Sequence, residues 1–276
     1  MDKVNFQSAF WTKKSLYDNA LFYYSLFPVL IWPILCVIDA PYGKFAGKLI
    51  IDIQLNGKLG WFIMEATSPA LFVATILPPV YQSFTSLQPV WTTTQTVLSV
   101  MWLTHYINRS TIYPLRAHSM SPMNILTFLS SLLFNGANAY TNGMWVAKYG
   151  SYPDSLLEKP RFWFGVALWG AGWWLNIHHD NILFRLRRER QVKDNQKRYS
   201  IPRGGLFEYV SCPNYFSESL EWIGWAIACY PSPPANVFVL ATIANLFPRA
   251  WRSHKWYKQE FPDYPPKRKA VVPFLF

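Results

Sequence analysis

Seven apolar segments, separated by polar ones, restrict what this chain can fold into. A helix that crosses the hydrocarbon core of a bilayer needs about 20 mostly apolar residues. The last two segments are shorter, and the proline-rich turn "PSPPAN" joins them, so we interpret them as a hairpin. The pattern predicts an all-α, polytopic membrane protein, a bundle of seven transmembrane helices. The predicted spans are roughly residues 21–38, 60–78, 91–106, 125–145, 162–177, 217–230 and 235–247.

The distribution of Lys and Arg predicts how this bundle is oriented. With seven spans, one side of the membrane receives the segments 39–59, 107–124, 178–216 and 248–276, which hold 20 of the 26 basic residues. Cytoplasmic loops carry an excess of Lys and Arg. We therefore expect a cytoplasmic C-terminus, an N-terminus outside or in a lumen, and one membrane domain over residues 1–276.

Composition supports a membrane protein and argues against a nucleic-acid-binding one. Aromatic residues make up 18% of the chain, with 14 Trp, and such residues gather at membrane interfaces. The net charge of +11 would also suit a nucleic-acid-binding domain. The apolar segments are too long for a soluble domain of that kind. We expect membrane lipid around the chain and no nucleic-acid partner.

Several polar residues lie inside the predicted spans, where an ionisable group is costly and is a functional candidate by default. Glu65 stands near the middle of the second span, in "WFIMEATSP". Tyr106 and Arg109 are three residues apart, which places them on one helix face. The alternative readings are an interhelical hydrogen bond for Glu65, and an interfacial anchor with a cytoplasmic arginine for the other two. Asn135, Asn138 and Asn142 have helical spacing and could equally be polar contacts between packed helices.

Three polar stripes lie at the ends of apolar segments, each on the side predicted to be cytoplasmic. At about 100° per residue, the members of each stripe share one helix face. Such stripes would converge on one site if their helices pack together. The stripes are Asn176, Asp180 and Arg187, then Asn214, Glu218 and Glu221, then Arg249, Ser253 and Tyr257.

The residue types in these stripes suit a phosphorylated dinucleotide. Guanidinium groups match phosphate in a bidentate fork, and carboxylates accept hydrogen bonds from ribose hydroxyls or a carboxamide. The soluble dinucleotide fingerprint is missing, because "GAGWWL" at residue 170 lies inside a span and not between a strand and a helix. We expect no metal site, because the adjacent His178 and His179 point to different sides of a helix and no third ligand has suitable spacing.

Ordered motifs along the chain are similar to those of the membrane steroid 5α-reductase family, the 3-oxo-5α-steroid 4-dehydrogenases. The likeness covers nearly the whole chain and is densest from residue 176 onward. One departure is Met64, where animal members commonly have Gln. The motifs are "APYGK", "WFIME", "HYINR", "GANAYTNG", "NIHHDNILFRLR", "YSIPRGGLFEYVSCPNYFSESLEWIGWA", "RAWRSHKWY" and "DYPPKRKAVVPFLF".

This resemblance implies seven transmembrane helices, NADPH as the cofactor, and reduction of the C4=C5 double bond of 3-oxo-Δ4-steroids. It implies that Glu65 and Tyr106 hold the C3 ketone, with Trp61 also in the substrate site. Residues 1–125 or so would supply the substrate-side helices, and about 126–276 the NADPH-binding helices and cytoplasmic loops. The implied cofactor site is Arg109, Asn138, Asn176, Asp180, Arg187, Tyr199, Asn214, Glu218, Arg249 and Tyr257.

The expected chemistry is hydride attack on the β-carbon of an enone, which develops negative charge on the ketone oxygen. Tyr106 can donate a hydrogen bond to that oxygen, and Glu65 can donate when protonated, a state that burial in an apolar bundle favours. The substrate is expected to be a small lipophilic steroid that enters from the bilayer. The expected membrane is the endoplasmic reticulum in a eukaryote or the inner membrane in a bacterium, with no obligate protein partner.

Three other functions remain open on the sequence. A polyprenol or trans-2-enoyl thioester reductase of the same superfamily would use the same hydride transfer but would need a longer substrate channel. A membrane methyltransferase of the isoprenylcysteine type has a helical bundle and a basic C-terminal cofactor region. A transporter with a polar site at mid-membrane would show inverted repeats, and we find none in the sequence.

Overall fold

The computed structural model describes residues 13–38, 53–85, 91–192 and 199–276. These residues are mostly helical, and each predicted apolar segment overlaps one long helix. Between the helices lie a short helix, α4 (Tyr113–Arg116), and two antiparallel strands, β1 (Gln54–Leu55) and β2 (Met123–Asn124). The long helices are α1 (Lys14–Val37), α2 (Gly57–Thr85), α3 (Thr93–Ile107), α5 (Ile125–Met144), α6 (Pro160–Val192), α7 (Pro213–Ala228) and α8 (Pro233–Glu260).

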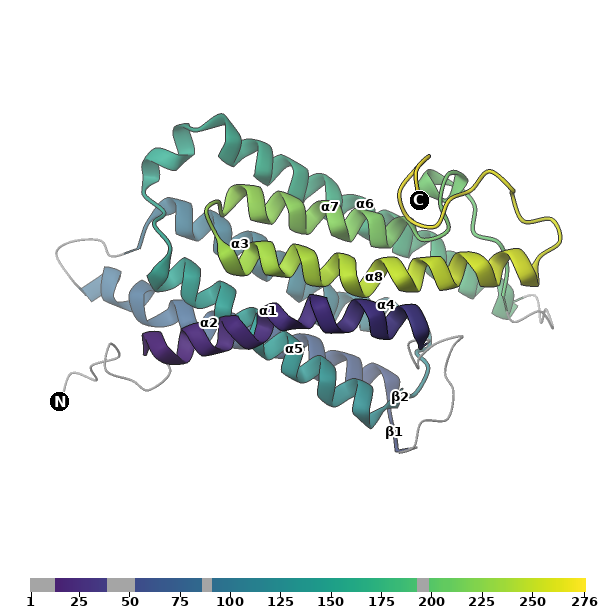
Figure 1. Cartoon of the computed structure of the whole chain (residues 1–276), viewed down its shortest axis with the longest axis horizontal. Helices are drawn as coiled ribbons and strands as arrows, with labels where there is room; N and C mark the ends of the chain where they lie inside the picture. Colours follow the sequence, from purple (N-terminus) through teal and green to yellow (C-terminus); the bar gives the residue numbers. More distant parts are fainter. Residues whose placement is uncertain (1–12, 39–52, 86–90, 193–198) are drawn as a thin grey trace.

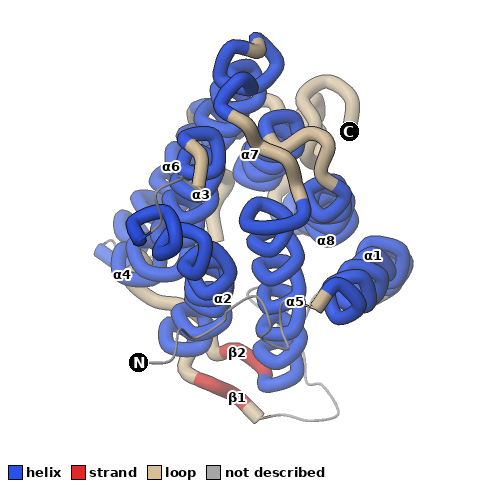
Figure 2. Tube along the Cα trace, turned by 90° about the vertical axis from the view of Figure 1, so that its left-hand side faces the viewer, coloured by secondary structure: helices blue, strands red, loops and turns tan. Residues whose placement is uncertain are grey.

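The long helices run side by side, and successive ones run in opposite directions along the long axis of the molecule (Figure 1). The end of α6, the start of α7 and the end of α8 therefore lie at one end, together with the C-terminus. Seen along the bundle, α1 lies at its outer edge, beside α5 and α8 (Figure 2). Two helical segments among the described residues are long and apolar enough to cross a membrane, Lys14–Val37 and Gly57–Ser83.

Two helices continue well beyond the apolar segments that predicted them. The fifth span was predicted to end at residue 177, but α6 extends to Val192, so Asn176, Asp180 and Arg187 lie on one helix as expected. Similarly, α8 passes residue 247 and reaches Glu260. These extensions carry the polar stripes, and because stripe and apolar segment share one helix, the apolar packing positions the polar groups.

The start of α3 is fixed by side chains that accept hydrogen bonds from its first backbone N–H groups, which have no partner within the helix. Thr92 and Gln95 form a reciprocal capping box. Asp154, from the loop before α6, accepts a hydrogen bond from the Thr94 backbone N–H at 3.0 Å. This bond, with others from Thr93 and Thr94, holds the pKa of Asp154 below its usual value.

The helix that carries Tyr106 widens just after that residue. Residues Asn108–Ile112 form a π-helical turn between α3 and α4. The sequence predicted a regular helix here, with Tyr106 and Arg109 three residues apart on one face. The wider turn changes the direction in which Arg109 projects, and π-turns of this kind occur frequently at functional sites.

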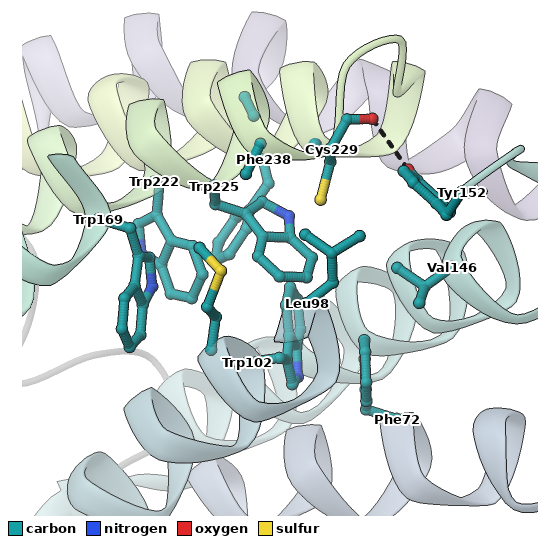
Figure 3. Packing of buried hydrophobic residues seen from close by; sticks show 14 of the residues in the cluster. Phe72, Leu98, Trp102, Val146, Tyr152, Trp169, Trp222, Trp225, Cys229 and Phe238 are labelled. Carbon is teal, nitrogen blue, oxygen red and sulfur yellow. Dashed lines mark hydrogen bonds between the residues drawn. The ribbon is translucent and has the colours of Figure 1, made fainter. Parts of the chain in front are cut away.

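The centre of the bundle is an aromatic cluster around Trp102, which is fully buried (Figure 3). Its indole ring lies 5.0 Å from the Phe72 ring, 5.3 Å from Trp225 and 5.6 Å from Phe238. The Tyr106 ring is also 5.0 Å from Trp102. Rings at these separations add to the apolar burial that holds helices together. The cluster thus joins α2, α3, α7 and α8 and fixes the position of Tyr106.

Glycines allow α6 and α7 to approach each other closely. A Cβ atom placed on Gly172 would lie 2.4 Å from the backbone nitrogen of Glu221, and one on Gly224 would lie 2.3 Å from that of Trp169. Small residues at such crossings let helix backbones come together in membrane proteins. The glycine pair of "GAGWWL" therefore has a packing role at Gly172.

We expect Gly172→Ala to destabilise the protein by about 1–3 kcal/mol, the range for overpacking a tight contact. The backbone of α7 blocks the new methyl group, so the two helices must separate. Gly170→Ala is the matched control, because nothing lies within 4 Å of a Cβ there. Thermal unfolding in detergent measures both variants. Equal melting temperatures would show that the α6–α7 contact does not depend on Gly172.

Candidate active site

The polar site is built around an ion pair between Arg109 and Asp180. Their side chains, on the π-turn and on α6, are only 15% and 8% exposed, and Nη1 lies 3.4 Å from Oδ2. The Arg109 guanidinium also lies over the rings of Trp61 and Tyr113, 5.1 and 4.7 Å from their centroids. The Trp61 indole N–H donates to the Arg109 carbonyl oxygen at 3.0 Å. Arg109 thus links the predicted substrate residue Trp61 to the predicted cofactor residue Asp180.

Amide and carboxylate groups extend this ion pair across α6 and α7. The Asn176 amide donates to Glu218 Oε2 and to the Asn214 carbonyl oxygen, both at 3.3 Å. The Asn214 amide reaches Asp180 Oδ1 at 3.5 Å. The first two polar stripes therefore meet directly, as the sequence predicted.

The third stripe is connected to the second through Tyr215, a residue that was not predicted. Arg249 on α8 donates from Nη2 to the Tyr215 hydroxyl at 2.9 Å, and its guanidinium lies 5.1 Å from that ring. Tyr215 follows Asn214 on α7, so Arg249 lies beside the second stripe. The position of Tyr215, at the polar end of an apolar segment, was the sequence signal that could have identified it as a site residue.

The phenol of Tyr106 is held in a buried hydrogen-bond network. The Asn138 amide nitrogen donates to the Tyr106 oxygen at 3.1 Å. The Asn138 side-chain oxygen accepts from the Tyr24 hydroxyl at 2.8 Å and from Asn142 at 2.9 Å. With its oxygen accepting from Asn138, the Tyr106 hydroxyl can donate its own hydrogen elsewhere. Asn135 likewise donates to the Met64 carbonyl oxygen at 2.7 Å, so Asn135 and Asn138 make the contacts between helices that were one of the two readings of these residues. The cofactor role implied for Asn138 stays a prediction.

Glu65 lies on α2, whereas Tyr106 lies on α3. The Glu65 side chain is half-buried. Its carboxyl group interacts electrostatically with Tyr106, His105 and Arg109. Among the described residues it has no hydrogen-bond partner, so the simple interhelical bond considered from the sequence is not formed there. Glu65 and the Tyr106 hydroxyl thus interact electrostatically, and each has capacity for a further hydrogen bond.

Glu221, the third member of the second stripe, pairs with His105 on α3, a partner that sequence reasoning missed. His105 Nδ1 lies 2.6 Å from Glu221 Oε1, and the two side chains are 5% and 0% exposed. The His105 ring also meets the rings of Tyr106 and Trp222, with centroids 4.9 and 4.5 Å apart. Both residues stand in apolar segments, which was a usable signal, but their pairing depends on how α3 and α7 pack.

Three predicted cofactor residues lie outside the buried network. Arg187 is exposed near the end of α6 and interacts electrostatically with Asp180 and Tyr113. Tyr199 and Tyr257 both contact the Trp256 ring, at 5.0 and 5.1 Å. They are at the end of the bundle that the polar stripes share, farther out than Asp180.

The "RGG" segment forms a turn that packs on α6. Gly204 and Gly205 have φ angles of 92° and 55°, values that favour glycine. His179, fully buried, accepts a hydrogen bond at Nε2 from the Leu206 backbone N–H at 3.1 Å. Glu208 accepts from the Gly204 N–H at 2.6 Å and lies 3.4 Å from Arg268, and these contacts hold the Glu208 pKa below its usual value.

The lowered Glu208 pKa predicts an acid-sensitive turn. An acid with a lower pKa in the folded state adds stability above its unfolded pKa, about 4.3, and that stability is lost as the pH falls through the folded value. The protection factor of the Gly204 amide, its exchange rate relative to an unstructured amide at the same pH, should therefore fall below about pH 4.5. In Glu208→Gln this protection factor should already be low at pH 7 and depend much less on pH. A wild-type amide equally protected at pH 3 and pH 7 would contradict the assignment.

Comparison with known protein families matches this chain to enzymes of steroid metabolism. A model of the family described as 3-oxo-5-alpha-steroid 4-dehydrogenase matches residues 121–276. The matched residues include α5, α6, α7 and α8. All three polar stripes therefore lie within the matched part of the chain.

Individual relatives extend the likeness to nearly the full chain. Steroid 5-alpha-reductase DET2 of Solanum lycopersicum is 38% identical over 270 residues, covering 94% of this chain and 98% of that protein. The 3-oxo-5-alpha-steroid 4-dehydrogenase 1 of Bos taurus is 36% identical over 252 residues, covering 90% and 92%. An uncharacterized protein of Schizosaccharomyces pombe, C9.08c, is 36% identical over 284 residues, covering 94% and 99%.

Proposed function

Because this chain belongs to the steroid 5α-reductase (3-oxo-5-alpha-steroid 4-dehydrogenase) family, we propose that it reduces the C4=C5 double bond of 3-oxo-Δ4-steroids, with NADPH as reductant. Family membership makes the chain a membrane-associated oxidoreductase of steroid metabolism. The finer proposal is supported by Glu65 and Tyr106, which lie on the neighbouring helices α2 and α3 and interact electrostatically. The Tyr106 hydroxyl hydrogen and the Glu65 carboxyl group are not used in the hydrogen bonds described above.

The polar site has the groups that a phosphorylated nicotinamide dinucleotide needs. Arg249 and Arg187 supply guanidinium groups for phosphates, and Asp180 and Glu218 supply acceptors for ribose hydroxyls. The Asn176 and Asn214 amides can pair with a carboxamide. These residues would hold NADPH along the end of α6, α7 and α8. When bound, NADPH supplies the hydride that reduces the double bond.

The chain's own residues act on the C3 oxygen of the steroid. Negative charge develops there as the double bond is reduced, and donors aimed at it are most effective in a water-excluded site. Tyr106 donates its hydroxyl hydrogen, and Asn138 holds the phenol in position. Glu65, as the neutral acid, donates a second hydrogen bond. Trp61, on α2 as Glu65 is, would provide an apolar ring surface for the steroid, while the buried Trp102 ring supports the Tyr106 ring from behind.

We also propose that the seven long helices cross the membrane with the C-terminus in the cytoplasm. The alternating helix directions support this, and so does the gathering of 20 of the 26 Lys and Arg residues in the segments assigned to one side. The polar site at that end would open to cytoplasmic NADPH. The apolar outer surface, including exposed Leu30 and Val29 on α1, would contact lipid and leave a route for a lipophilic substrate.

A substrate panel on purified, reconstituted protein tests the proposed activity. With NADPH and testosterone or progesterone, we expect loss of absorbance at 340 nm and a 5α-reduced 3-oxosteroid identified by mass spectrometry against standards. A polyprenol and a trans-2-enoyl thioester are the competing substrates. Preferential reduction of either would overturn the steroid assignment. Binding of S-adenosylmethionine in place of NADPH would overturn the reductase itself.

A further inference from the structure

A cavity with basic side chains in its wall lies at the C-terminal end of the bundle. Its volume is about 590 Å³, and α8 together with the C-terminal segment after it forms its walls. Four basic side chains line it: Lys258, Lys267, Arg268 and Lys269. The proposed reduction uses none of them, so this concentration of positive charge needs its own account.

Most of the positive charge of this cavity has no acidic partner among the described residues, since only Arg268 forms an ion pair, with Glu208. In the part of the chain that the structure describes, no carboxylate forms an ion pair with Lys258, Lys267 or Lys269, and all three are exposed. His254, which also lines the cavity, adds no charge at pH 7. Burial and the charges of Lys258 and Lys269 lower the pKa of His254 to about 4. A cavity lined by four cationic side chains, of which only Arg268 pairs with a carboxylate among the described residues, favours an anion.

Arg268 shows that this charge is built into the fold. Its side chain is only 2% exposed. It donates to the Pro202 carbonyl oxygen at 2.9 Å and lies 3.4 Å from Glu208, yet its buried Nε has no acceptor among the described residues. A buried donor without a partner is costly unless a ligand or water satisfies it. The cavity therefore combines mobile lysines with one fixed guanidinium.

The cavity is separate from the proposed cofactor site. On α8, at about 100° per residue, the face with Trp251, His254 and Lys258 lies roughly 130° from the face with Arg249 and Tyr257. Trp251, His254 and Lys258 line the cavity. One dinucleotide on the cofactor stripe would therefore not also occupy this cavity.

An apolar rim borders the basic residues. Phe274 and Leu275 are 75% and 79% exposed, and the rings of Trp251 and Phe276 stack at 5.7 Å. Large exposed apolar side chains next to lysines are typical of surfaces at the membrane interface, where acyl chains meet headgroups. A soluble anion would use the lysines and leave this rim without a role.

We propose that this cavity binds the phosphate headgroup of an acidic phospholipid, with Lys258, Lys267, Lys269 and Arg268 around the phosphate. Trp251, Phe274 and Leu275 contact its acyl chains. Basic pockets on the cytoplasmic side of membrane helices bind anionic headgroups in this way. The bound lipid anchors the C-terminal segment to the bilayer, and the site works independently of steroid reduction.

Lipid titration of the full chain in detergent, followed by native mass spectrometry, tests this site. Phosphatidic acid and phosphatidylcholine with identical acyl chains are the probes. A lysine near an anionic surface contributes about fivefold in affinity, so the wild type should prefer phosphatidic acid by about a hundredfold. The triple variant Lys258→Gln, Lys267→Gln, Lys269→Gln should lose most of that preference. NADPH binding and steroid reduction in phosphatidylcholine should stay at wild-type levels.

A matched triple variant controls for net charge: Lys58→Gln, Lys148→Gln, Lys159→Gln, which should keep the preference. Equal preference for phosphatidic acid in the cavity variant and the wild type would overturn the proposal, as would a wild type that does not distinguish the two lipids. Glycerol 3-phosphate separates lipid from soluble ligand. If it binds as tightly as phosphatidic acid, the cavity holds a free phosphate ester and the lipid assignment is wrong.

Discussion

Tyr106→Phe should lower kcat/KM for a 3-oxo-Δ4-steroid by about 10²–10³-fold, the effect of removing one donor from an oxyanion site. The ring stays in the aromatic cluster beside Trp102, so the fold is kept. What is lost is the one phenolic hydrogen aimed at the developing charge. Steady-state reduction of progesterone with NADPH measures the loss, and NADPH affinity should not change.

Two further variants show whether the loss is specific to that oxygen. Tyr24→Phe removes the other phenol bonded to Asn138, at 2.8 Å, and should cost less than tenfold because Tyr24 only positions the amide. Glu65→Gln keeps a donor and the shape, so it should retain more activity than Glu65→Ala. Near-native turnover in both Tyr106→Phe and Glu65→Gln would remove these residues from the catalytic site.

Arg109→Gln should destabilise the protein by about 3–5 kcal/mol, the usual cost of removing one partner from a buried ion pair. The substitution leaves the Asp180 carboxylate without its cation and removes the guanidinium that contacts the rings of Trp61 and Tyr113. It also removes a positive charge that interacts with Glu65 and Glu218. The melting temperature in detergent without cofactor should fall accordingly.

A double-mutant cycle tests whether the loss comes from the unpaired acid. Adding Asp180→Asn should recover part of the stability, so that the double variant is more stable than the sum of the single effects predicts. Arg116→Gln is the control, because Arg116 is exposed and bonds to the neutral Asn181. Strict additivity, or an Arg109 variant as stable as Arg116→Gln, would mean that the ion pair does not organise the site.

The lengths of the apolar segments predict much of this fold. Each of the seven predicted segments is helical, and the spacing of Asn176 and Asp180 predicted a stripe that α6 presents to Asn214 and Glu218. Hydropathy alone placed the ends of α6 and α8 too early. It detects only the apolar part of a helix, and both helices continue into charged residues. The polar periodicity beyond those ends was the better guide to helix length.

Other parts of the site depend on packing that periodicity does not contain. The π-turn at Asn108–Ile112 arises within a regular-looking helical sequence. The His105–Glu221 pair and the bond from Tyr24 to Asn138 join residues 116 and 114 positions apart. Such pairs require the packing of α3 against α7 and of α1 against α5, which the spacing within one helix does not specify.

Following the hydride tests the proposed function most directly. Reconstituted protein is incubated with testosterone and NADPH that carries deuterium at both C4 positions of the nicotinamide, and the product is analysed by NMR and mass spectrometry. We predict a 5α-reduced ketone with one deuterium at C5 and hydrogen from solvent at C4. A reduced product with deuterium at another carbon, or with none, would contradict the proposed arrangement of Glu65, Tyr106 and the cofactor residues around one steroid.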